Sequence, residues 1–157
     1  MGPSKTESLS GYRLGVAFGS AAIIERMEKL QAIVSLRAAG YNQAVLRSWF
    51  GEPAGWIENR VKQHQAIRDD VIRVFQGAGL LARSPQAGSY LFPTLPPLTV
   101  NLADFVRLLR HQAQVIVTPG TEFGPHENSI RLNFSQNCSV AVEAAKRIVD
   151  MVGRCRT

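Results

Sequence analysis

The chain opens with the sequence SKTESLSGYRLG at residues 4–15, which is its most specific signal. Lys5 stands eight residues ahead of Arg13, with the small residues Ser10 and Gly11 between them. A lysine amine can condense with an aldehyde to form a Schiff base. An arginine binds phosphate well because its planar fork presents paired N–H donors and stays charged. The two side chains are therefore suited to hold opposite ends of one small molecule that carries both groups.

The same residues have a simpler interpretation, as the start of a helix. Ser4 and Glu7 form a capping-box pattern, in which Lys5 is an exposed residue of the first turn. For these four residues alone the cap is the commoner case. The sequence GYRLG at 11–15 and a second motif far along the chain favour the binding interpretation.

The second motif consists of TPGTEFG at residues 118–124 and SIRLNFS at residues 129–135. Arg131 lies between the apolar residues Ile130 and Leu132, which a strand would place on the opposite face. A bidentate arginine–carboxylate pair both binds a small acid and orients it. A strand arginine on a solvated face is the alternative, and the neighbouring residues leave both interpretations open.

Together these motifs resemble the class I and II aminotransferases, which are fold-type I pyridoxal-phosphate enzymes. In that family a Ser-Lys pair holds the cofactor as an aldimine, and an arginine eight residues on binds its phosphate; Ser4, Lys5 and Arg13 match. A Pro-Gly-x-x-Phe-Gly loop precedes the arginine that grips the substrate α-carboxylate, and Arg131 matches it. Residues 88–90, Gly-Ser-Tyr, resemble the family's Gly-small-aromatic stretch near the substrate entrance.

The resemblance implies an aminotransferase that uses pyridoxal 5'-phosphate to transfer an amino group between an amino acid and a 2-oxo acid. Lys5 would be catalytic, Ser4, Lys5 and Arg13 would bind the cofactor, and Arg131 would bind the substrate. The implied fold class is α/β: a large-domain segment at residues 1–75 and the two-layer small C-terminal domain at residues 76–157. A homodimer in the cytoplasm is also implied. A lyase or decarboxylase of the same fold and a truncated, non-catalytic dimerisation or binding module are the alternatives.

The resemblance covers nearly the whole chain but only the C-terminal part, under half, of a typical family member. In the family, the groups that stack on the cofactor ring, pair with its nitrogen and cradle its phosphate lie upstream of the lysine. We therefore expect the chain alone to lack the cofactor. We also expect its first ~50 residues to pack against another copy or to stay loosely packed, because an unpaired apolar strand is costly in water.

Composition narrows the function classes. The 157 residues are 45% hydrophobic and contain no apolar run of membrane-spanning length. The net charge of +6 suggests nucleic-acid binding, but the basic residues are mixed with acids and form no basic run, so we expect none. Cys138 and Cys155 lack metal-site or redox spacing, which favours reduced thiols in a cytoplasm and no metal.

Apolar periodicity and turn residues predict the elements. The sequence predicts helices over residues 21–36, 56–76, 102–111 and 139–153, and strands over residues 14–19, 89–94, 115–118 and 130–134. Asn101 and Ser139 are predicted helix caps, Gly77 and Gly79 end the long helix, and Gly153 ends the last helix. Helices interleaved with strands predict a two-layer sandwich of helices on a small sheet.

Overall fold

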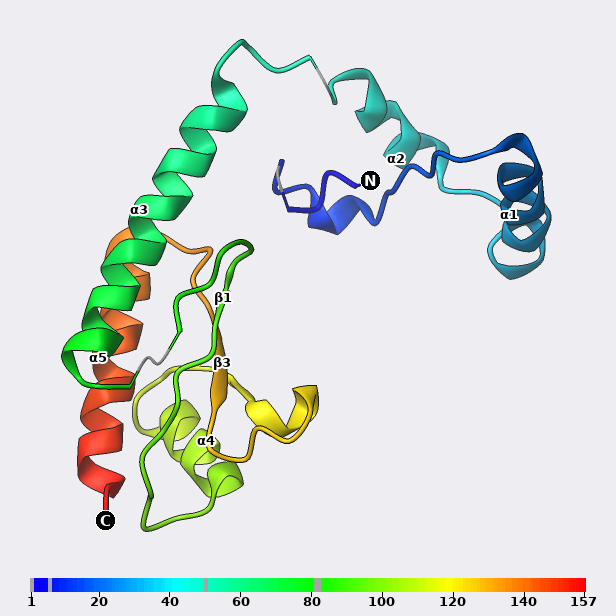
Figure 1. Ribbon diagram of the computed structural model, residues 1–157. Helices are drawn as coiled ribbons and strands as arrows, with labels where there is room; N and C mark the ends of the chain where they lie inside the picture. The colour runs from blue at the N-terminus through cyan, green and yellow to red at the C-terminus, as the bar shows by residue number, and fades with distance from the viewer. Residues whose placement is uncertain (1, 6, 50, 81–82) are drawn as a thin grey trace. The chain divides into compact units, whose positions relative to one another are not determined.

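The computed structural model describes residues 2–5, 7–49, 51–80 and 83–157 of the chain (Figure 1). The chain divides into two compact units, residues 1–60 and residues 61–157, and each unit is described by itself. This division falls inside the long helix α3 (Trp56–Gly77). The predicted domain boundary after residue 75 refers to the domains of the family and stays a prediction.

The first unit is built from short helical segments. They are η1 (Ser10–Tyr12), α1 (Ala21–Val34), α2 (Gly40–Ala44), η2 (Val45–Arg47) and the start of α3. Helix α1 confirms the helix predicted from residue 21, although it ends two residues earlier than predicted. None of its residues is buried, and its large apolar side chains are exposed, namely Ile23, Met27, Leu30, Ile33 and Val34.

The buried strand predicted over residues 14–19 is wrong. Leu14 is buried, but residues 15–19 form no strand and all except the half-buried Val16 are exposed. A strand needs a neighbouring strand to satisfy its backbone N–H and C=O groups. Among the described residues of the first unit there is no strand to supply that pairing.

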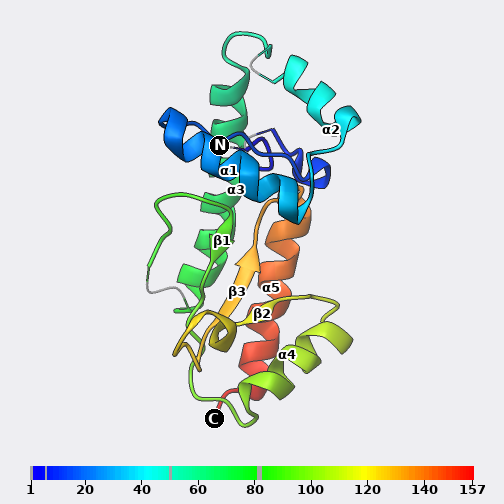
Figure 2. The ribbon, with the colours of Figure 1, turned by 90° about the vertical axis from the view of Figure 1, so that its right-hand side faces the viewer.

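The second unit contains a three-stranded antiparallel sheet with the order β1-β3-β2. Its strands are β1 (Tyr90–Leu91), β2 (Thr118–Pro119) and β3 (Ile130–Asn133). Strands β1 and β3 lie within predicted strands but are shorter, and β2 begins at the last residue of a predicted strand. In Figure 2, β3 lies between β1 and β2, with α4 (Leu102–His111) beside β2. Strand β1 ends two residues before Pro93, which has no N–H to donate to the ladder.

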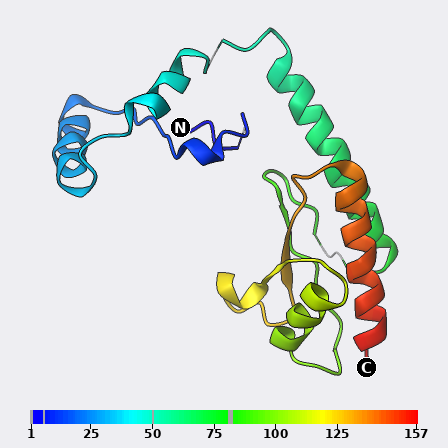
Figure 3. The same ribbon diagram turned by 180° about the vertical axis from the view of Figure 1, so that it is seen from behind.

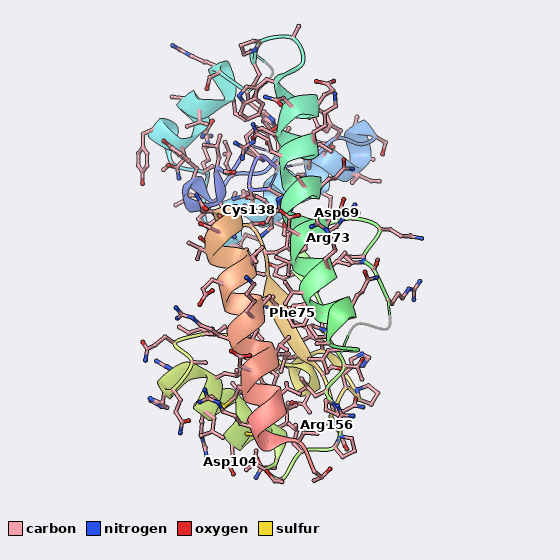
Figure 4. All side chains as sticks on the ribbon, turned by 90° about the vertical axis from the view of Figure 1, so that its left-hand side faces the viewer. Asp69, Arg73, Phe75, Asp104, Cys138 and Arg156 are labelled. Atoms are coloured by element: carbon pink, nitrogen blue, oxygen red, sulfur yellow. The ribbon has the colours of Figure 1, made fainter. Side chains whose placement is uncertain are left out.

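The hydrophobic core lies between this sheet and the helices. Helix α4 contacts both β2 and the last helix, α5 (Cys138–Cys155), and α3 and α5 run side by side (Figure 4). The core residues come from α3, β1, α4, β3, α5 and the segments that connect the elements, among them Phe75, Leu91, Phe105, Ile130, Phe134 and Ile148. Along β3, Ile130 and Leu132 are buried in this core, so Arg131 belongs to the opposite face.

The ends of α3 and α4 follow the sequence signals. At the end of α3, Gly79 adopts a left-handed conformation with φ +70°. The Gly79 amide donates to the Gln76 carbonyl and the Leu80 amide to the Phe75 carbonyl, which is a Schellman motif. At the start of α4, the Asn101 side chain accepts a hydrogen bond from the Asp104 amide, which confirms the predicted cap.

Both predicted ends of the last helix are wrong. The cap of α5 is Asn137, whose side-chain oxygen accepts the Ser139 amide at 3.0 Å, and the helix already includes Cys138. Asparagine and serine are similar as caps, so composition alone could not choose between them. At the other end the helix continues past Gly153 to Cys155, since a helical glycine does not by itself stop a helix. No helix in the described ranges is long and apolar enough to cross a membrane.

Candidate functional site

The opening segment of the first unit folds back on itself. Gly2 packs so closely that a Cβ there would lie 3.2 Å from the Leu14 carbonyl oxygen. The Leu9 amide donates to the carbonyl of the buried Pro3 at 3.0 Å. Ser4 is half-buried and Lys5 is exposed in the turn that follows Pro3. Lys5 therefore lies in a loop whose two ends are held together by local packing.

Arg13 lies at the far end of the same loop. It follows η1 in a left-handed conformation with φ +50°. Its Nη1 donates to the Ser10 carbonyl at 3.0 Å, while the side chain is exposed. In the described part of the chain no carboxylate forms an ion pair with it, so the rest of its fork is available for an anion. The loop thus presents an amine, a hydroxyl and a guanidinium, donor groups that suit a molecule with an aldehyde and a phosphate.

Arg131 occupies the central strand of the second unit. It is half-buried, and it pairs in register with Thr118 of the neighbouring strand β2. Its guanidinium carbon lies 4.5 Å from the centre of the Tyr90 ring and 4.1 Å from the centre of the Phe123 ring. Among the residues that the structure describes, no carboxylate lies within ion-pair distance of it. An arginine that is half-buried without an acid partner is suited to bind a carboxylate from outside the chain.

The loop before β3 has a shape that depends on its glycines. A Cβ on Gly120 would lie 2.5 Å from the His126 carbonyl oxygen and 2.7 Å from that of Ser129, so only glycine fits. The Gly120 amide donates to the Ser129 carbonyl at 2.7 Å. Gly124 has φ +122°, a conformation that side chains other than glycine rarely adopt. Between them, η3 (Gly120–Phe123) carries Phe123 to the guanidinium of Arg131.

The predicted site residues are thus divided between the two units. Ser4, Lys5 and Arg13 share one loop of the first unit, and Arg131 belongs to the second. The aromatic contacts of Arg131 were missed by reasoning from the sequence. The signals were present, because Tyr90 closes the Gly-Ser-Tyr stretch and Phe123 is part of the Pro-Gly-x-x-Phe-Gly loop, but neither motif says which side chain they contact.

A separate polar cluster joins α3 to the start of α5 in the second unit (Figure 4). The Cys138 thiol donates to Asp70 Oδ2 at 3.1 Å, and Asp70 also forms an ion pair with Arg73. The hydrogen bond and the negative charge of Asp70 both disfavour the thiolate. They raise the pKa of Cys138 above its ordinary value, with burial adding to the effect.

Known proteins resemble this chain over almost its whole length. The family model described as aminotransferase class I and II matches residues 2–148. An aspartate aminotransferase from Pyrococcus horikoshii is 28% identical, over 92% of this chain and 38% of its own length. An LL-diaminopimelate aminotransferase from Nitratidesulfovibrio vulgaris is 26% identical over 94% of this chain and 38% of its own length.

Solved structures agree with the sequence relatives. The crystal structure of an aspartate aminotransferase from Rhodobacter sphaeroides is 67% identical, with a TM-score of 0.94, covering 100% of this chain and 41% of that one. An aromatic aminotransferase from Pyrococcus horikoshii has a TM-score of 0.84 at 26% identity, covering 98% of this chain and 42% of that one. The chain therefore spans about two fifths of the length of these relatives, and the predicted α/β fold class, part of a fold-type I aminotransferase, is confirmed. Since the family model matches far more than half of its residues, the chain belongs to the class I and II aminotransferases.

Proposed function

We propose that this chain is the C-terminal part of a pyridoxal-phosphate-dependent aminotransferase that transfers an amino group between an amino acid and a 2-oxo acid. The observation that carries the proposal is the half-buried guanidinium of Arg131, which has no carboxylate partner in the described ranges. The segment that the family model matches, residues 2–148, includes both Lys5 and Arg131. Arg131 does not belong to the hydrophobic core of its unit, and Lys5 is exposed.

Arg131 is proposed to bind the α-carboxylate of the substrate. Its fork can donate two parallel N–H bonds to the two carboxylate oxygens, and this fixes the orientation of the acid. A fixed carboxylate also fixes the position of the neighbouring α-carbon, where the bond to hydrogen must be broken. Such positioning is a large part of the rate enhancement in reactions that need two groups in register.

Ser4, Lys5 and Arg13 are proposed to hold the cofactor. The exposed Lys5 amine suits an aldehyde, and the Arg13 fork, with one N–H on the Ser10 carbonyl, suits a phosphate. When bound, pyridoxal 5'-phosphate supplies the electron sink that stabilises negative charge at the substrate α-carbon. Lys5 is then the base that takes the α-proton and returns it as an acid.

The proposal extends to the setting of the whole enzyme. A homodimer follows from the resemblance to the family. Cys138 and Cys155 are both free thiols, which supports a cytoplasmic location, where thiols stay reduced.

The test joins this chain to the part of the enzyme that it does not span. Residues 2–157 would replace the matching 41% of the Rhodobacter sphaeroides protein, which is 67% identical. Borohydride reduction with the cofactor, followed by peptide mapping, should find the pyridoxyl label on Lys5. Lys5→Ala should abolish amino transfer, whereas Lys29→Ala, which removes an exposed helix lysine paired with Glu25, should leave it unchanged.

Each other outcome points to a different function. A label on Lys29, Lys62 or Lys146 contradicts the assignment of Lys5. A label on Lys5 with release of carbon dioxide or breakage of another substrate bond, without amino transfer, indicates a decarboxylase or lyase. A chimera that pairs and folds but takes up no label indicates a binding or dimerisation module.

A further inference from the structure

The face of the sheet that carries Arg131 is distinct from the face that packs on the core. Arg131 and Asn133 are two residues apart on β3 and so share a face, while Ile130 and Leu132 are buried on the other. Tyr90 pairs directly with Asn133, and Thr118 pairs directly with Arg131. The register therefore places Tyr90 on the same face as Arg131, one step diagonally along the neighbouring strand.

Two aromatic rings approach the guanidinium from opposite edges of β3. Tyr90 comes from β1, on one side of β3, and Phe123 comes from η3, which follows β2 on the other side. Figure 3 shows η3 on the side of β3 away from α5. The Arg131 carbon lies over both rings, at 4.5 and 4.1 Å. At these distances the ring faces attract the cation.

Phe123 in turn packs against a second aromatic ring, that of Phe92. The Phe92 ring meets it edge to face at 5.7 Å, and the Phe92 ring lies 6.2 Å from that of His126. The backbone of η3 is fixed at its first residue, since Gly120 fits closely against the carbonyls of His126 and Ser129. Phe123 is 41% exposed, so filling the core does not explain why a phenyl ring stands there.

From this geometry we infer that Phe123 and Tyr90 are positioning residues for Arg131. A guanidinium carries its N–H donors in one plane, at its rim. The Arg131 carbon lies over the faces of both rings, so the rings hold the cation in this place, and the N–H groups that do not point at a ring can still bind an anion. The arrangement favours a planar carboxylate, which can lie in the guanidinium plane and accept two parallel hydrogen bonds. The inference rests on the proposed role of Arg131 as the carboxylate-binding residue.

The first measurement asks whether the rings hold the guanidinium in the 157-residue chain. The side-chain Nε–H signal of Arg131, assigned by its loss in Arg131→Lys, should be displaced by the ring currents from the range of the other arginines. Phe123→Leu should return it part of the way to that range, because the Tyr90 ring remains, and Phe123→Tyr, which keeps the ring, should not. Phe92→Leu is the comparison variant: this ring is 40% exposed and contacts Phe123 but, in the described chain, not Arg131, so its loss should move the signal less than Phe123→Leu does. Tyr90→Leu, which removes the other ring, is the second test should Phe123→Leu fail to fold.

The second measurement asks whether the rings matter for binding. Phenylglyoxal modification of Arg131, followed by mass spectrometry, would be slowed by sodium acetate relative to sodium chloride at equal ionic strength. Phe123→Leu should weaken this protection by about two- to five-fold, the factor expected for an exposed cation–π contact. Phe123→Tyr should restore it.

The outcomes separate the inference from the proposed function. An Nε–H signal that does not move in Phe123→Leu or in Tyr90→Leu, or acetate protection that is equal in Phe123→Leu and the parent chain, overturns the positioning role. Acetate that fails to protect Arg131 in the parent overturns the carboxylate assignment instead, and the positioning role is then decided by the Nε–H signal.

Discussion

Replacing Gly120 with alanine places a methyl group where the loop before β3 has no room. The added Cβ would lie 2.5 Å from the His126 carbonyl oxygen, 2.7 Å from the Ser129 carbonyl oxygen and 2.9 Å from the His126 Cβ. The two oxygens are backbone atoms, so a rotated side chain cannot relieve the contact. The backbone must move, and the 2.7 Å hydrogen bond from the Gly120 amide to Ser129 is the first interaction at risk.

The magnitude follows from two opposing effects. Overpacking of this kind costs about 1–3 kcal/mol. The smaller conformational freedom of alanine in the unfolded chain offsets about 0.4–1 kcal/mol. We therefore expect Gly120→Ala to lower the free energy of unfolding by about 0.5–2 kcal/mol, the cost of overpacking less the offset from the unfolded chain.

A second glycine of the same unit provides the control. Gly153 lies within α5, is exposed, and has no atom within 4 Å of where its Cβ would be. Gly153→Ala should raise the free energy of unfolding by about 0.5–1 kcal/mol, because alanine favours a helix more than glycine does. Urea denaturation followed by far-ultraviolet circular dichroism compares the two variants with the parent chain. Equal stability of the Gly120→Ala and Gly153→Ala variants would refute the reasoning, because it would mean that the loop yields at no cost.

Three further predictions concern the cap of α5, its cysteine and the proposed substrate arginine. Asn137→Ala should lower the free energy of unfolding by about 1 kcal/mol, and Ser139→Ala by clearly less, since the Asn137 side chain accepts the Ser139 amide; equal losses in urea denaturation would contradict the assigned cap. Asp70→Asn should lower the pKa of the Cys138 thiol, because it replaces the carboxylate whose hydrogen bond and charge raise that pKa, and should speed alkylation by iodoacetamide at mildly alkaline pH; an unchanged pH profile, followed by mass spectrometry at this cysteine, would count against that cause. In the chimera, Arg131→Lys should weaken carboxylate binding by about 1.5–3 kcal/mol, because lysine keeps the charge but loses the fork; amines without a carboxylate are the control, and equal losses for both would show a structural role.

The local sequence determined the elements whose signals act over a few residues. The periodic apolar positions of α3, the left-handed Gly79 at its end and the Asn101 cap of α4 all depend on contacts within one or two turns. The two functional motifs are of the same kind, because the spacing of Lys5 from Arg13 and the loop before Arg131 are continuous stretches of chain. Such features can be predicted from the sequence without knowing what the segment packs against.

The tertiary structure decided what depends on partners distant in sequence. Residues 14–19 look like a buried strand, but a strand exists only where another strand pairs with it, and the described part of the first unit has none. Tyr90 and Phe123 reach Arg131 because β3 lies between β1 and β2, and no pattern within either motif specifies that strand order. Residue types and their spacing thus predicted which groups we propose to carry the chemistry, whereas the pairing of strands determined what surrounds Arg131.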